Sequence, residues 1–460
     1  MREEAIVGLE RHLRGSVVRR SHPDYDLTRA VFNGSVDKRP LLIVRCADEN
    51  DVSAAVCFAR EHGLPLAVRG GGHSAAGFGV SKNGLVIDQS LMRSVRVDPA
   101  EGSVTVDGGC TQGEVDDATH PLGLAVPCGV FPATGLAGLA LGGGHGYLSR
   151  KYGLTIDSLV AARMVLANGD MVTANAADNA DLFWAMRGGG GNFGVVTRFV
   201  FRAHPVGSVH AGPIVWEERD ARTVVRWYRD FLPNAGEDFY AFLSLQTIPA
   251  EQPFPRGAWG KFAIALIFGC HGSPDNRRRT MDKIRSELPK PLFDGCREMP
   301  FYDLQEMGRG AFAPGLHWYW KGALVTSISD TALEVYFEEF ARAPSAACHV
   351  HFYPIDGMVH GIGKNDTAWN CRHATWSLDI AGVDADAANA GTLRKWAQGY
   401  FEAARPFTLD AGYVNFMMND EAETRVRSTY GDNYPRLQML KRKYDPDNLF
   451  RLNQNIRPAV

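Results

Sequence analysis

The chain has 460 residues, of which 45% are hydrophobic and 22% charged, and its formal net charge is −3. This is the composition of a water-soluble protein with a large core, in two domains or in one large α/β domain. The near balance of charge offers no broad basic surface, which argues against nucleic acid or an acidic membrane as the main partner.

The sequence also lacks the patterns of a signal peptide, a membrane span and a zinc site. The N-terminus lacks the apolar core of a signal peptide, and no stretch reaches the roughly 18–20 apolar residues of a membrane span. The eight cysteines show neither a C-x-x-C pair nor the spacing of zinc ligands. We therefore expect a cytoplasmic protein with reduced thiols, no membrane partner and no metal site.

The first 200 residues alternate between short strands and helices. A strand, a helix and a second strand are expected over 41–70, with Asp48 or Asn50 capping the helix and Gly63 ending it. Later segments predict strands or hairpins at 84–90, 94–109, 158–175 and 194–205, and short helices at 111–124 and 180–188.

The sequence changes in character after about residue 208. Runs rich in aromatic residues predict strands at 238–248, 262–272, 317–328, 348–362 and 374–383, and helical spacing predicts helices at 331–343 and 387–405. A short strand at 412–417 and a basic helix at 434–446 are expected to follow. This pattern predicts an α+β domain, in which helices cover one face of a mainly antiparallel sheet.

One strand offers a candidate pocket wall. In the sequence HWYWKG (317–322), alternation places Trp318 and Trp320 on one face of the strand and Tyr319 and Lys321 on the other. Aromatic side chains on one face of a sheet can stack on a flat substrate, or they can belong to the core.

Three glycine clusters lie in the first half of the chain, at 70–79, 134–153 and 187–196. Glycine lets several backbone N–H groups point at one phosphate, because no Cβ stands in the way. The first cluster ends in Gly-His-Ser, without the lysine of a P-loop, and no clear helix follows it as in a Rossmann fold. The clusters therefore indicate nucleotide binding in another kind of fold.

Taken together, several stretches resemble the FAD-linked oxidases of the berberine bridge enzyme and bacterial hydroxynicotine oxidase type, which have the vanillyl-alcohol-oxidase (PCMH-like) fold. The matching stretches are PLAVRGGGHSAAGFG, TGLAGLALGGGHGYLSRKYGLTIDSL, DLFWAMRGGGGNFGVVT, YVNF and KRKYDPDNLFRLNQNI, which occur in the family's order between residues 65 and 456. The resemblance implies an FAD-binding domain at 1–208, an inserted substrate-binding domain at 209–410, and a segment at 411–460 that returns to the first domain.

The resemblance also implies which residues hold the cofactor. His73 would be bonded covalently to the flavin, and the loop from Arg69 to Ser74 would hold the pyrophosphate. The full set of implied FAD contacts is Arg69, Gly70, Gly71, Gly72, His73, Ser74, Gly77, Phe78, Thr134, Gly135, Gly138, Leu139, Gly142, Gly143, Gly144, Gly146, Asp157, Val195, Val196, Asn415, Asn453 and Asn455.

Many relatives carry a second flavin link, on the cysteine of a G-x-C-P sequence. Here the corresponding stretch reads Gly129-Val130-Phe131-Pro132, so Phe131 stands at the position of the link. Cys128 lies three residues earlier, which in an extended loop is roughly 10 Å away. We therefore expect a single link through His73, with Cys128 unlinked.

The family's chemistry is hydride transfer from a substrate C–H to flavin, followed by reduction of O₂ to H₂O₂. Alcohol oxidation also needs a base, which many relatives place on the second tyrosine of Y-x-N-Y. Here Phe416 takes that place, so we expect it to line the pocket without proton chemistry and Tyr413 to serve in orientation. Candidate catalytic residues are therefore Tyr413 and the residues Tyr319, Tyr353, His373 and Asp379 of expected strands.

The missing tyrosine favours an amine or an aromatic hydroxyl compound over a simple sugar or aliphatic alcohol as substrate. The expected partners are thus a small molecule and O₂, in a monomer or homodimer. Two alternatives stay open: a dehydrogenase of the same fold that uses another electron acceptor, and a flavin-binding relative without catalysis.

Overall fold

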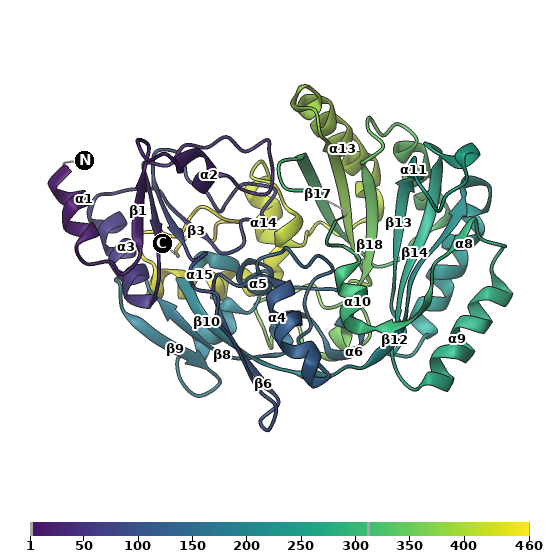
Figure 1. Ribbon diagram of the computed structural model, residues 1–460, viewed down its shortest axis with the longest axis horizontal. Coiled ribbons are helices and arrows are strands. Elements are labelled where there is room, and N and C mark those ends of the chain that lie inside the picture. The colour runs from purple at the N-terminus through teal and green to yellow at the C-terminus, as the bar shows by residue number, and fades with distance from the viewer. Residues whose placement is uncertain (1–2, 311–312, 460) are drawn as a thin grey trace.

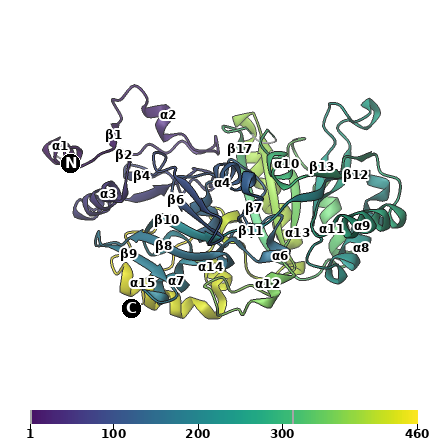
Figure 2. The same cartoon turned by 60° about the horizontal axis from the view of Figure 1, so that its bottom comes forward.

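The structure is a computed structural model that describes residues 3–310 and 313–459. Its N-terminal part lies beside a large sheet formed by the middle of the chain, and the C-terminal residues return to the first part (Figure 1). In a second view, helix α15 (Tyr434–Tyr444) lies beside α7 (Ala180–Met186), which is more than 240 residues earlier in the chain (Figure 2). Within the described residues, no helix has the length and apolar composition to cross a bilayer.

The first sheet has four strands, in the order β1 (Ser16–Arg19), β2 (Leu42–Arg45), β4 (Leu85–Asp88) and β3 (Leu66–Arg69). β2, β4 and β3 run parallel, and α3 (Glu49–Glu61) connects β2 to β3. The α3 helix begins where the sequence predicts, because the Asp48 carboxylate accepts hydrogen bonds from the N–H groups of Asn50 and Asp51. The short helix α1 (Glu3–Glu10) precedes β1, and α2 (Tyr25–Arg29) lies between β1 and β2 in the sequence.

The second sheet has five antiparallel strands, in the order β5 (Val95–Asp98), β6 (Ser103–Asp107), β10 (Val195–Arg202), β8 (Leu159–Val165) and β9 (Met171–Asn175). The expected hairpins at 94–109 and 158–175 are both present. Short elements connect these strands: α4 (Gln112–Thr119), α5 (Leu136–Leu141), α6 (Ser149–Tyr152), and the small pair β7 (Leu124–Ala125) and β11 (His204–Pro205).

The third sheet is antiparallel and contains the middle of the chain. Its order is β15 (Phe293–Asp294), β12 (Ser208–Glu217), β14 (Phe262–Cys270), β13 (Ala241–Thr247), β18 (His349–Pro354), β19 (Trp376–Asp384) and β17 (His317–Val325), with β16 (Arg297–Pro300) also paired to β12. The long helices α8 (Glu218–Phe231), α9 (Pro274–Glu287), α11 (Asp330–Phe340) and α13 (Ala390–Ala404) share one apolar cluster with this sheet. The expected α+β architecture is confirmed; the boundaries at 208 and 410 stay a prediction.

Two expected strand positions are wrong. Residues 412–417 contain a 3-10 turn at Val414–Phe416, in which the Phe416 N–H donates a hydrogen bond to the Tyr413 carbonyl oxygen, and the Tyr413 hydroxyl accepts hydrogen bonds from Gly144 and Asn415. His373 lies in an exposed turn before β19 and not on the strand itself. The remaining short helices are α10 (Phe301–Glu306), α12 (Met358–Gly361) and α14 (Glu423–Tyr430).

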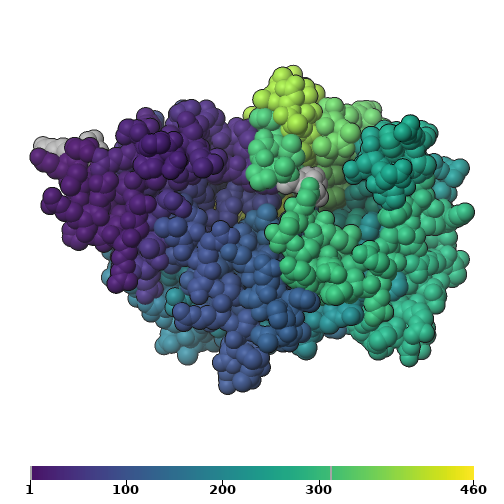
Figure 3. All heavy atoms as spheres, in the orientation of Figure 1, coloured from purple at the N-terminus to yellow at the C-terminus, as the bar shows by residue number. Residues whose placement is uncertain are grey.

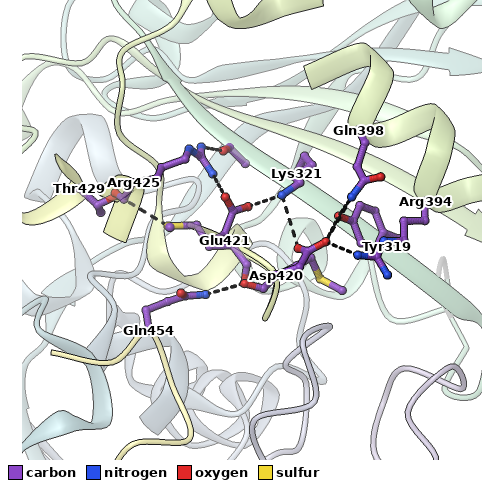
Figure 4. Close-up of polar contacts among 12 residues, drawn as sticks. Tyr319, Lys321, Arg394, Gln398, Asp420, Glu421, Arg425, Thr429 and Gln454 are labelled. Carbon is purple, nitrogen blue, oxygen red and sulfur yellow. Dashed lines mark hydrogen bonds and ion pairs between the residues drawn. The ribbon is translucent and has the colours of Figure 1, made fainter. Parts of the chain in front are cut away.

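A cluster of charged residues joins the C-terminal segment to β17, the last strand of its sheet, on the face that carries Tyr319 and Lys321. We call this the reverse face of β17. Lys321 Nζ lies 2.7 Å from Glu421, and Glu421 lies 2.7 Å from Arg425, with each side chain less than one-tenth exposed. Asp420 extends the cluster to Arg394 at the surface. Figure 4 shows Glu421 between the two cations. Because each buried charge has a partner, the cluster fixes the C-terminal segment to the sheet.

Replacing the buried acid should destabilise the fold strongly. In Glu421→Gln, Lys321 and Arg425 stay buried without their shared counter-charge, so we expect a loss of about 3–5 kcal/mol in the free energy of unfolding. Urea unfolding followed by tryptophan fluorescence measures this loss. The matched control is Arg394→Gln in the same cluster: its side chain is 54% exposed, so the loss should stay below about 1 kcal/mol. Equal losses in the two variants would contradict the account.

Candidate active site

A cavity lies between the glycine loops of the N-terminal part and the third sheet. Figure 3 shows the molecular surface hollowed between the purple and blue N-terminal residues and the green middle residues. The cavity wall takes residues from the loop after β3, from α5, from the loop before β10, from β17, β18 and β19, and from the C-terminal segment. The three glycine clusters and the aromatic strand therefore meet at one site.

The first two glycine loops touch each other. A Cβ on Gly71 would lie 2.6 Å from the backbone N and Cα of Gly135, closer than real contacts allow. Glycines of these loops are expected to allow the close approach of a ligand. At Gly71 the first reason is different: the lack of a side chain lets two loops of the cavity wall meet.

His73 lies in the cavity wall, as the family resemblance implies. Its ring stacks on Phe32 at 3.9 Å between centroids and lies 6.5 Å from the ring of Trp320. Burial lowers the pKa of His73 to about 4, so the imidazole is neutral at physiological pH. A neutral ring nitrogen has a free electron pair, which covalent attachment to a flavin requires.

Most of the implied cofactor residues line this cavity. They are Arg69, Gly70, Gly71, Gly72, His73, Ser74, Phe78, Thr134, Gly135, Gly138, Leu139, Val195, Val196, Asn415 and Asn453. Arg69 also pairs with buried Asp88 at 2.9 Å, which fixes the end of β3.

Seven implied contacts lie outside this cavity wall, and their contact with FAD stays a prediction: Gly77, Gly142, Gly143, Gly144, Gly146, Asp157 and Asn455. Asp157 forms a buried two-point ion pair with Arg372, with both distances 2.7 Å. A Cβ on Gly142 would collide with the Asn415 side chain, and one on Gly146 with the Cys128 carbonyl oxygen. These glycines allow tight packing of protein against protein behind the cavity.

Phe131 lines the cavity, whereas Cys128 does not. The Cys128 side chain belongs to an apolar cluster, and burial raises the pKa of its thiol well above the ordinary value. A thiol that stays protonated is a poor nucleophile, so this environment favours an unlinked Cys128.

The alternation expected for β17 is present. Trp318 and Trp320 line the cavity, while Tyr319 and Lys321 point to the opposite face. The Tyr319 hydroxyl donates a hydrogen bond to Asp420 at 2.7 Å. Of the candidate bases, Tyr319 therefore points away from the cavity, and His373 lies in an exposed turn outside the cavity wall.

Of the candidate bases, Tyr353, Asp379 and Tyr413 lie in the cavity wall, and the Tyr353 hydroxyl is hydrogen-bonded to His351 Nδ1 at 2.7 Å. Asp379 of β19 is the carboxylic acid among them. It is 4% exposed, and its Oδ1 has no hydrogen-bond partner among the described residues. Burial alone raises the pKa of this carboxyl to about 8. An isolated buried acid in a cavity is typical of a functional site, because elsewhere such a group would be paired or absent.

Tyr413 also lines the cavity, but its hydroxyl is already engaged. It accepts hydrogen bonds from the Gly144 N–H at 3.1 Å and from Asn415 Nδ2 at 2.8 Å. Burial raises the pKa of Tyr413 to about 12, so its proton stays bound at physiological pH. These contacts suit a residue that orients the turn at 413–416 better than one that accepts a proton.

Sequence reasoning missed several residues of the cavity wall. His145, His349, Phe32, Arg309 and Gln454 line the cavity but were not among the expected site residues. Neither ring nitrogen of His145 has a hydrogen-bond partner on another described residue, and burial lowers the pKa of this histidine to about 3. Its place in the second glycine cluster was the available signal.

Comparison with known proteins agrees with this geometry. The family model described as "FAD binding domain" matches residues 40–175, and the model "Berberine and berberine like" matches residues 412–457. The FAD-linked oxidoreductase YgaK of Bacillus subtilis is 30% identical over 456 residues, with 97% of each chain covered. The (R)-6-hydroxynicotine oxidase of Paenarthrobacter nicotinovorans is 29% identical, also with 97% of each chain covered.

Solved structures share the whole fold. The 6-hydroxy-D-nicotine oxidase of Arthrobacter nicotinovorans superposes with a TM-score of 0.87 at 25% identity, over 97% of this chain and 98% of that one. BBE-like 1 of Physcomitrella patens superposes with a TM-score of 0.88 at 22% identity, over 99% of each chain. Since family models, full-length relatives and fold agree, this chain belongs to the berberine bridge enzyme-like family of FAD-linked oxidoreductases.

Proposed function

We propose that this protein is an oxidase with FAD bonded covalently to His73, and that it oxidises a small amine, phenol or alcohol at the expense of O₂. The observation that carries the proposal is Asp379, a buried and incompletely paired acid in the same cavity wall as His73. The relative named as a 6-hydroxynicotine oxidase supports the oxidase reaction.

The cavity wall fits the cofactor. A Cβ on Gly138 would meet no atom of the described residues outside its own helix within 4 Å, so this part of the wall leaves room for a ligand. Gln89 Oε1 and Asn453 Oδ1 are buried beside the cavity without a hydrogen-bond partner among the described residues. Buried polar atoms are nearly always paired, so these two indicate a bound polar group. The residues that would hold FAD are those of the three glycine loops together with Asn415, Asn453 and His73.

Bound FAD supplies a hydride acceptor and a route for two electrons to O₂. The chain's own contribution is position and proton transfer. As the substrate C–H bond breaks, the ionised Asp379 carboxylate takes the proton of the neighbouring hydroxyl or amine. Trp318, Trp320 and Phe416 form aromatic walls around this acid. Such walls favour a flat amine or phenol over a sugar, which would need many hydrogen-bond partners.

The flavin link predicts a difference between two variants. His73→Ala should release all flavin into the supernatant on acid precipitation, because the covalent bond is lost. Cys128→Ala is the matched control and should keep flavin in the pellet, because its thiol lies outside the cavity wall. Absorbance of the two fractions measures this. A flavin-cysteinyl peptide in the mass spectrum of the wild type would overturn the single-link proposal.

The open space at Gly138 predicts where a side chain would displace the cofactor. Gly138→Val should lower the flavin content per chain by at least about tenfold, because the new side chain enters the ligand's space. The control is Gly391→Val in α13, where a Cβ also meets no atom within 4 Å among the described residues beyond its own helix. Flavin absorbance per protein gives the result. Equal flavin contents in the two variants would show that Gly138 does not contact the cofactor.

The proposed base predicts a pH dependence. The Asp379 carboxyl carries a proton below its pKa of about 8 and cannot accept another, so flavin reduction should speed up as the pH rises through about 8. Asp379→Asn should slow reduction by about 10²–10⁴-fold and remove this pH dependence. Tyr413→Phe should have a modest effect. The rate of flavin reduction is measured by anaerobic stopped flow, with a substrate found by screening for H₂O₂ release. If flavin reduction were abolished in Tyr413→Phe, Tyr413 would be the base instead.

A further inference from the structure

The residue of β17 nearest to Asp379 has no side chain. Gly322 pairs with Asp379 across the antiparallel strands, and Asp379 pairs with His351 on its other side. Trp318, Trp320 and Gly322 share the cavity face of β17, since side chains alternate along a strand. In this row of the sheet, Gly322 leaves a notch beside the acid.

Phe416 fills this notch. A Cβ on Gly322 would lie 2.5 Å from the Phe416 Cβ and 3.1 Å from the Phe416 carbonyl oxygen, so any side chain at position 322 would displace Phe416. Directly opposed Cβ positions in a sheet are about 4.5–5.5 Å apart, which places Phe416 beside Asp379. The Phe416 ring also lies 5.8 Å from Trp320 and 5.9 Å from Tyr353, so it closes an aromatic wall over the acid.

The same stretch of chain holds β17 from behind. Arg425 donates a hydrogen bond to the Gly322 carbonyl oxygen, and the Glu421 carboxylate joins Arg425 to Lys321, the neighbour of Gly322 (Figure 4). The C-terminal segment therefore passes around the edge of the sheet, with Phe416 on the cavity face and Arg425 on the reverse face. Phe416 and Arg425 both contact Gly322, and we call the segment from Phe416 to Arg425 the clasp.

We infer that Gly322 and Arg425 are positioning residues that seat Phe416 against Asp379 and so keep water away from the proposed base. The inference rests on the role proposed for Asp379. It explains why a glycine stands in the middle of a buried strand, where it forfeits packing and costs conformational entropy.

The pKa of Asp379 depends directly on whether Phe416 keeps water away from its carboxyl group. The titratable groups on the cavity face of β18 are His349, His351 and Tyr353, while Lys321 points away on the reverse face of β17. Tyr413 and His145 lie beyond Phe416, with ring centroids 4.9 Å and 5.5 Å from it. Since burial is the cause of the raised pKa of Asp379, admitting water should lower that pKa.

The test is an infrared titration of the purified holoenzyme. The protonated-carboxyl band that disappears in Asp379→Asn identifies Asp379, and its midpoint is then followed in other variants. Gly322→Ala should move this midpoint down by about one pH unit or more, because the methyl group displaces Phe416 and admits water. The matched control is Gly382→Ala on the neighbouring strand, where a Cβ would crowd Leu393 on the helix side at 3.1 Å. Its midpoint should equal that of the wild type.

Two further variants test the same inference if Gly322→Ala folds poorly. Phe416→Ala removes the shield itself and should lower the midpoint with Gly322 intact. Arg425→Lys keeps the charge but weakens the hold on the Gly322 carbonyl oxygen, and should give a smaller shift in the same direction. An unshifted midpoint in Phe416→Ala, or equal shifts in Gly322→Ala and Gly382→Ala, overturns the inference. The titration needs no turnover, so it tests the position of Phe416 separately from the proposed function. The proposed function would be refuted by the absence of flavin from the purified protein.

Discussion

The clasp of the C-terminal segment around the free edge of β17 is the constraint on which the site depends. β17 is the last strand of its sheet, and an uncovered edge strand invites pairing with other chains. Here Asn33 exchanges two hydrogen bonds with the backbone of Trp318, and the Leu409 N–H donates to the Leu324 carbonyl oxygen. Arg425 covers the middle of the strand at Gly322. Covering this edge brings Tyr413, Asn415 and Phe416 between the glycine loops and the sheet.

The two parts of the molecule contribute different chemistry to the one cavity. The loops offer backbone and small residues, which suits a large polar cofactor, while the sheet offers indole and phenyl rings around one acid. The charged residues Lys321, Glu421 and Arg425 lie on the reverse face of β17, away from the cavity. Burial is therefore what raises the pKa of Asp379 on the cavity face. The pKa of Asp379 is therefore sensitive to how tightly the aromatic wall closes.

Local patterns predicted much of this arrangement. Alternation in HWYWKG placed Trp318 and Trp320 together on one face, and the capping residue Asp48 placed the start of α3. The same alternation could not tell which face borders a cavity, so Tyr319 and Asp379 looked equivalent until the fold separated them. The protein contacts of Gly71 and Asp157 could not be predicted either, because their partners, Gly135 and Arg372, are 64 and 215 residues away in the chain. The sequence at 412–417 is typical of a strand, but in the structure the Phe416 N–H donates to the Tyr413 carbonyl oxygen and the chain forms a 3-10 turn at Val414–Phe416.

The central claim is that one cavity holds the flavin ring with Asp379 facing the substrate position. A crystal structure of the purified holoenzyme tests it most directly. The account predicts continuous electron density from the His73 ring to an isoalloxazine, with the ring bordered by Trp320, Phe416 and the glycine loops and with Asp379 on the open side. A flavin ring bound elsewhere, or one separated from Asp379 by ordered protein, would contradict it.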